Sequence, residues 1–157
     1  MTVADITFTG GGIRDTDVAT GAGIQATKLE HQQSMDAELF DESTTVAALA
    51  SRLLHISYAA GTIVAFEGII TTQATGADRT VNVDLQKSTG GGAFASITTT
   101  DIEIDNTTTI RVPVAAVLSS TGLVDGDILR AVVSVAGSAD AQAIGLLVTL
   151  TIREDPS

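Results

Sequence analysis

Residues 144–152 read Ile-Gly-Leu-Leu-Val-Thr-Leu-Thr-Ile, with an apolar side chain at every second position. A repeat of two residues is typical of a β-strand with one face buried and the other exposed to water. On a helix, the same side chains would be spread around the whole circumference. Because such a strand buries one face, a second layer of structure must pack against it. The apolar positions are Ile144, Leu146, Val148, Leu150 and Ile152.

The composition favours an all-β domain without disulfide bonds. Threonine, valine and isoleucine are abundant, and their branched side chains favour strands. The 157 residues include no cysteine, so neither a disulfide bond nor a thiolate metal site can form. No basic segment precedes a long apolar run, so we expect neither a signal peptide nor a membrane span. We therefore expect synthesis and folding in the cytoplasm.

The charge balance argues against nucleic acid as a partner. With 19 acidic and 8 basic side chains, the formal net charge is −11 at pH 7. Such a surface repels a phosphate backbone. Aromatic residues make up 3% of the chain and tryptophan is absent, so stacking platforms for bases or sugars are scarce.

Turn signals divide the chain after residue 50 into short strands. Their spacing of roughly 8–12 residues predicts an antiparallel β-sandwich or barrel of about eight strands. Pro113 lacks an N–H group, which indicates that its strand lies at a sheet edge. A single helical turn is expected over residues 114–118. Strands are expected at residues 53–58, 62–72, 81–86, 97–104, 110–114, 129–135 and 144–152, with 53–58 as the first core strand.

The expected strand at residues 62–72 is apolar on both faces. A strand of this kind is either central in a sheet or in contact with a neighbouring subunit. One sandwich interior does not need so much apolar surface, and the excess indicates a protein interface. The apolar residues are Ile63, Val64, Phe66, Ile69 and Ile70.

Residues 1–25 are predicted to form an extended arm ahead of a β-sandwich domain at residues 26–157. Residues 1–42 hold eight acidic and two basic side chains and too few apolar ones to form a core by themselves. Residues 26–40 are either a long edge strand or a weak helix, and periodicity does not decide between them. The candidate interface residues are Ile6, Phe8 and Ile13 in the arm and Ile63, Phe66 and Ile69 in the body.

The sequence carries no motif typical of catalysis or of a metal site. His31 and His55 are the only histidines, and no Gly-x-Ser-x-Gly motif presents a nucleophilic serine. The two histidines also lack the short spacing of zinc ligands on a helix. The acidic residues at 101–105 share one strand face, but Asn106 stands where a calcium-binding EF-hand loop needs glycine. We therefore expect neither an enzyme nor a cofactor.

Five segments of the body lie at residues 29–32 (Leu-Glu-His-Gln), 54–58 (Leu-His-Ile-Ser-Tyr), 61–66 (Gly-Thr-Ile-Val-Ala-Phe), 81–87 (Val-Asn-Val-Asp-Leu-Gln-Lys) and 125–129 (Asp-Gly-Asp-Ile-Leu). Together they resemble the capsid cement, or decoration, proteins of tailed bacteriophages. The likeness covers residues 26–155. It implies a trimeric, jelly-roll-like β-sandwich at threefold positions of the outer capsid surface. It also implies an N-terminal arm that reaches over neighbouring capsomers, the phage major capsid protein as partner, and the virion as location.

Other classes of function stay open. A carbohydrate- or receptor-binding module of a phage tail or cell surface fits the same fold class, but such modules usually expose aromatic platforms. An enzyme would show a deep pocket with a pair of titratable groups of shifted pKa. Tail-tube or baseplate proteins would form rings or tubes. The aromatic residues, most of them expected to be buried, are Phe8, Phe40, Tyr58, Phe66 and Phe94.

Overall fold

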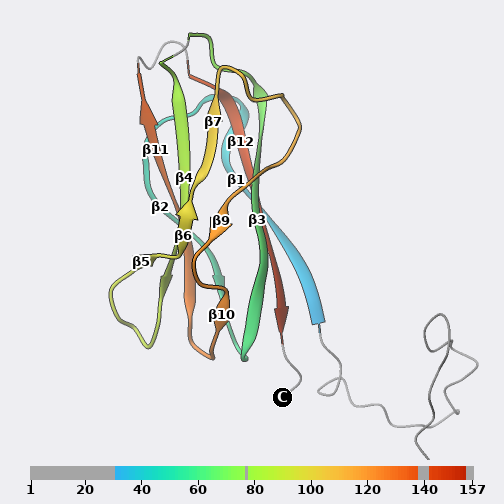
Figure 1. The fold of residues 1–157 in the computed structure, drawn as a ribbon, viewed down its shortest axis with the longest axis vertical. Helices are drawn as coiled ribbons and strands as arrows, with labels where there is room; N and C mark the ends of the chain where they lie inside the picture. The colour runs from blue at the N-terminus through green and yellow to red at the C-terminus, as the bar shows by residue number, and fades with distance from the viewer. Residues whose placement is uncertain (1–30, 77, 138–141, 155–157) are drawn as a thin grey trace, which may run out of the picture.

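A computed structural model describes residues 31–76, 78–137 and 142–154 of the chain. These residues form strands, turns and loops, without a helix (Figure 1). The predicted arm at residues 1–25, with Ile6, Phe8 and Ile13, lies outside the described residues. The strands are β1 (His31–Thr45), β2 (Leu49–Ile56), β3 (Gly61–Thr72), β4 (Thr80–Ser88), β5 (Ala95–Ser96), β6 (Thr98–Thr100), β7 (Ile102–Asp105), β8 (Val114–Ala115), β9 (Val117–Leu118), β10 (Gly122–Leu123), β11 (Ile128–Ala136) and β12 (Ile144–Glu154).

The strands form two antiparallel sheets that pack as a sandwich, which confirms the predicted fold class. The first sheet has the order β1-β12-β3-β10, and β8 also pairs with β3. The second sheet has the order β2-β11-β4-β5, and β7 also pairs with β4. A separate two-stranded ribbon joins β6 and β9. The described residues form twelve strands rather than about eight, because residues 95–123 form six short strands of two to four residues each.

The strand that decided the fold behaves as its pattern predicts over most of its length. Leu146, Val148, Leu150 and Ile152 are all buried, and residues between them are at least partly exposed. Ile144 is only partly buried, at the place where the register between β1 and β12 shifts from Phe40 opposite Leu146 to Thr45 opposite Ile144. The facing layer of the core comes from β4 and β11 and contributes Val81, Val83, Leu85, Leu129, Ala131 and Val133.

The strand β3 is apolar on both sides for a reason that the sequence alone does not reveal. Ile63 pairs with Ile152 and Ala65 pairs with Thr151, so Val64 is an extra residue, a β-bulge. The bulge reverses the alternation, and Ile63 and Phe66 therefore face the same side, each with 1% of its surface exposed. Their prediction as interface residues is wrong for this reason, since both belong to the core.

Two local predictions for residues 110–118 are also wrong. Residues 110–113 form a turn, and β8 begins only at Val114. Arg111 adopts a φ of 59°, and its N–H group donates a hydrogen bond to the Ile70 carbonyl over 3.0 Å. Instead of a helical turn, residues 114–118 form the two short strands β8 and β9.

The strand β1 settles the alternative left open for residues 26–40. From His31 onward the chain is a strand that pairs antiparallel with β12. The pairing starts with His31 opposite Glu154 and continues to Phe40 opposite Leu146. Both β1 and β2 lie at an edge of their sheets. The expectation that residues 53–58 form a core strand is therefore wrong, because β2 is an edge strand with most of its side chains exposed.

Candidate interaction surface

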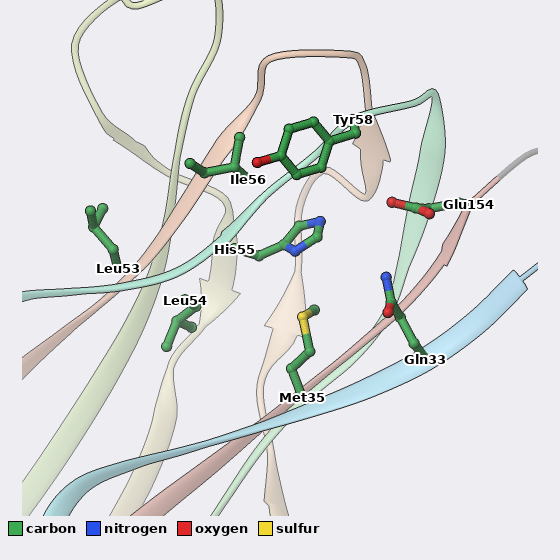
Figure 2. Close-up of a pocket in the computed structure, with 8 residues that line it drawn as sticks. All are labelled: Gln33, Met35, Leu53, Leu54, His55, Ile56, Tyr58 and Glu154. Atoms are coloured by element: carbon green, nitrogen blue, oxygen red, sulfur yellow. The ribbon is translucent and has the colours of Figure 1, made fainter.

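A hollow of the described structure lies between the two edge strands β1 and β2. It has a volume of about 570 Å³ and is open to solvent on one side. We call it the edge groove. Figure 2 shows its residues, which come from β1, from β2 and the turn after it, and from the end of β12. They are Gln33, Met35, Leu53, Leu54, His55, Ile56, Tyr58 and Glu154.

A register shift in β2 determines which side chains enter the edge groove. Leu129 of β11 pairs with His55, and the next residue, Arg130, pairs with Leu53, so Leu54 is an extra residue. Residues directly opposite each other in a sheet point to the same side. Since Leu129 is fully buried, His55 points between the sheets, whereas Leu53 shares the outer face with Arg130.

His55 is the polar centre of the edge groove. Its Nε2 atom is buried and has no hydrogen-bond partner within the described residues. Burial lowers the pKa of the imidazole below 6.5, and the nearby carboxylate of Glu154 opposes this shift. The neutral imidazole is therefore the favoured form at neutral pH.

The rim of the edge groove is unusually apolar for a solvent-exposed surface. Leu53 has 63% of its surface exposed, Ile56 has 44% and Tyr58 has 79%. Three exposed large apolar side chains within six residues, on an edge strand and the turn after it, mark an interaction surface rather than an ordinary solvent-exposed face. The sequence does not mark these residues as an interaction site, because the apolar run at 53–58 is equally typical of a buried strand.

The predicted site residues of the body lie in different places. Ile69 is partly buried on the outer face of the first sheet, where it pairs with Leu147. Ile63 and Phe66 lie in the core. The structure therefore does not bring the three together on one surface.

The acidic candidates have roles in the fold. Asp105 accepts hydrogen bonds from the N–H groups and hydroxyls of Thr107 and Thr108, and bonds from Thr107 make the largest contribution to holding its pKa below 3.8. Asp127 ends the turn that begins at Asp125, and its side chain is fully buried. Within the part of the chain that the structure describes, no three His, Asp or Glu side chains gather as a metal ion would need.

The comparisons with known proteins add no relative. No protein-family model matches the chain, and neither a curated protein nor a solved structure does. Within residues 31–76, 78–137 and 142–154 there is also no helix long and apolar enough to cross a membrane. Fold and surface chemistry are therefore the basis for assigning a function.

Proposed function

We propose that this protein is a structural virion protein that binds the outer surface of a phage capsid and clamps neighbouring major capsid proteins. The single observation that supports the proposal is the edge groove, whose exposed apolar rim of Leu53, Ile56 and Tyr58 suits a protein partner. The likeness of five body segments to capsid cement proteins points to the same class of partner. No separate catalytic chemistry is needed for this function.

The position of the edge groove suits a clamp. The strand β1 begins at His31, which pairs with Glu154, and both Gln33 and Glu154 line the groove. The strand β1 therefore starts beside this surface, and the predicted arm precedes it in the sequence. An arm and a groove that bind adjacent capsid subunits would each stabilise the assembled shell by mass action. A homotrimer would add avidity, because three linked contacts dissociate far more slowly than one.

Co-sedimentation of the full chain with expanded phage capsids tests the proposal. We expect the wild-type chain to pellet with the capsids and a Leu53→Ser/Tyr58→Ser double variant to bind at least tenfold more weakly, since two apolar anchors are lost. Val117→Ser is the matched control, because Val117 is 55% exposed on β9, outside the edge groove. A wild-type chain that stays in the supernatant with every capsid tried would contradict the proposal.

A chain lacking residues 1–25 tests the arm separately. We expect it to bind the capsids much more weakly than the full chain. Equal binding would remove the arm from the clamp while leaving the edge groove as the contact. Light scattering of the free protein measures the oligomeric state, and a mass of three chains is expected.

One observation favours a second candidate, a carbohydrate- or receptor-binding module. Tyr58 is 79% exposed and lies in the edge groove with Gln33 and Glu154, a combination that could stack on a sugar and bind its hydroxyls. Phe94 is a poorer platform, because the Arg130 guanidinium covers its ring at 3.9 Å from the centroid. A glycan-array signal that disappears in Tyr58→Ala would support this candidate over the capsid clamp.

A further inference from the structure

The outer face of the first sheet carries a second surface, formed by two adjacent rows of side chains across β3, β12 and β1. In one row, Ile69 pairs with Leu147, and Leu147 pairs with Glu38. In the next row, Glu67 pairs with Thr149, and Thr149 pairs with Asp36. Paired residues point to the same side of a sheet, so two apolar side chains and three carboxylates share this face.

Ile69 and Leu147 are both partly exposed. Two hollows of about 190 Å³ and 130 Å³ adjoin on this face, and both are lined by Ile69 and Leu147. Farther along the sheet the same face is polar, since the Ser34 and Thr151 hydroxyls lie 2.8 Å apart in a hydrogen bond. Each hollow is large enough for one or two aliphatic groups but too small for a drug-sized ligand.

The rim of this face is acidic. Glu38 and Glu42 line one hollow and Glu67 lines the other, and none of the three has an ion-pair partner within the described residues. Asp36 is held by a hydrogen bond from the Thr149 hydroxyl at 2.7 Å. Among the described residues, Arg111, which lines one hollow together with Glu67, is the one basic side chain at either hollow. The four carboxylates leave a local excess of negative charge.

From this arrangement we infer that the outer face of β1, β12 and β3 docks a protein segment with an apolar side chain between two cationic ones. The apolar side chain fills a hollow against Ile69 and Leu147. Lysine or arginine side chains on either side lay their aliphatic stems on the sheet and direct their charged ends to Glu38 and Glu67. Charge complementarity selects this class of partner, since an acidic or neutral segment gains nothing from the rim. The inference does not depend on the edge groove or on a capsid partner.

The test is an NMR titration of the ¹⁵N-labelled full chain with three capped tripeptides, Lys-Leu-Lys, Lys-Ser-Lys and Glu-Leu-Glu. We expect Lys-Leu-Lys to shift the amide signals of residues 36–38, 67–69 and 147–149 in a saturable way. Replacing its leucine with serine should weaken binding about tenfold, which is what burial of one leucine side chain contributes. Glu-Leu-Glu should not bind.

Variants separate this site from general attraction to an acidic protein. A Glu38→Gln/Glu67→Gln double variant and Ile69→Ser should each weaken Lys-Leu-Lys binding at least fivefold. Glu103→Gln, an exposed change on β7 of the other sheet, should leave binding unchanged. Equal binding of Lys-Leu-Lys and Lys-Ser-Lys, an equal effect of Glu103→Gln, or absence of shifts at the named residues would each overturn the inference. The spectra of the variants themselves report whether each one is folded.

Discussion

The Nζ atom of Lys87 lies 3.4 Å from Oδ2 of Asp127, whose side chain has no exposure to solvent. Lys87 also donates a hydrogen bond to the Gly122 carbonyl at 2.7 Å, and Asp127 accepts one from the Val124 N–H group at 3.1 Å. Lys87 and the buried Asp127 carboxylate together therefore connect β4, β10 and the turn that leads into β11. A buried charge of this kind is costly unless its partners stay in place.

Replacing Asp127 with asparagine should destabilise the fold by about 2–3 kcal/mol, because the charge-assisted contact with Lys87 is lost at a buried site. Urea unfolding monitored by circular dichroism measures the free energy of unfolding. Asp125→Asn is the matched control, because Asp125 is exposed in the same turn, and its effect should stay within about 0.5 kcal/mol. Equal effects of the two changes would contradict this role for Asp127.

Asp127 should also contribute to the acid stability of the protein. Burial alone would raise its pKa, but a hydrogen bond from Thr89, the Val124 N–H group and the nearby Lys87 hold it below 3.8. A carboxyl group with a lowered pKa in the folded state stabilises the fold above the pKa of the unfolded state. That contribution is lost as the pH falls through the folded-state pKa. The stability difference between wild type and Asp127→Asn should therefore be constant above about pH 5 and shrink below pH 3.8.

Gly145 should tolerate no side chain. Its φ is 65°, and a Cβ atom added to it would lie 2.5 Å from Thr71 Oγ1 and 3.0 Å from Glu42 Cα. We expect Gly145→Ala to cost about 2–5 kcal/mol, from backbone strain and overpacking together. Gly126→Ala measures the backbone strain without the overpacking, because Gly126 has a φ of 83° and no atom lies within 4 Å of the added Cβ. That control should cost only about 1 kcal/mol.

The imidazole of His55 should titrate below 6.5, because burial disfavours its charged form. NMR of the imidazole signals against pH measures this pKa directly. Glu154→Gln should lower it further, since the Glu154 carboxylate favours the protonated form. The neutral imidazole stabilises the fold above pH 6.5, and that contribution falls as the pH drops toward the folded-state pKa. A pKa above 6.5 would contradict the buried position of the ring.

The fold class could be predicted because alternation survives wherever a strand is regular. Leu146 to Ile152 alternate without interruption, and this strand packs as expected. Prediction failed at irregular positions, because one extra residue reverses the faces of a strand. The extra residue Val64 in β3 turns Ile63 and Phe66 to the same face. The extra residue Leu54 in β2 likewise determines which face His55 lies on. Bulges depend on the partner strand, so they leave no mark in the local pattern.

The candidate site was less accessible to prediction than the fold. The apolar rim of Leu53, Ile56 and Tyr58 is exposed only because β2 is the edge strand of its sheet. Strand order is a property of the whole topology, and no single segment encodes it. By contrast, the apolar excess of β3 predicts Ile69 as an interface residue, and its side chain lies on the outer face of the sheet.

The strand β1 has 15 residues and no strand on its outer edge within the described part of the chain. Such an edge could recruit the same strand of another molecule and start a fibre. At neutral pH, like charges on the β1 strands of two copies repel each other and oppose this pairing. The charged residues along β1 are Asp36, Glu38, Asp41 and Glu42. Salt shortens the range of this repulsion, so the protein should stay dispersed at low ionic strength and begin to coagulate in concentrated salt.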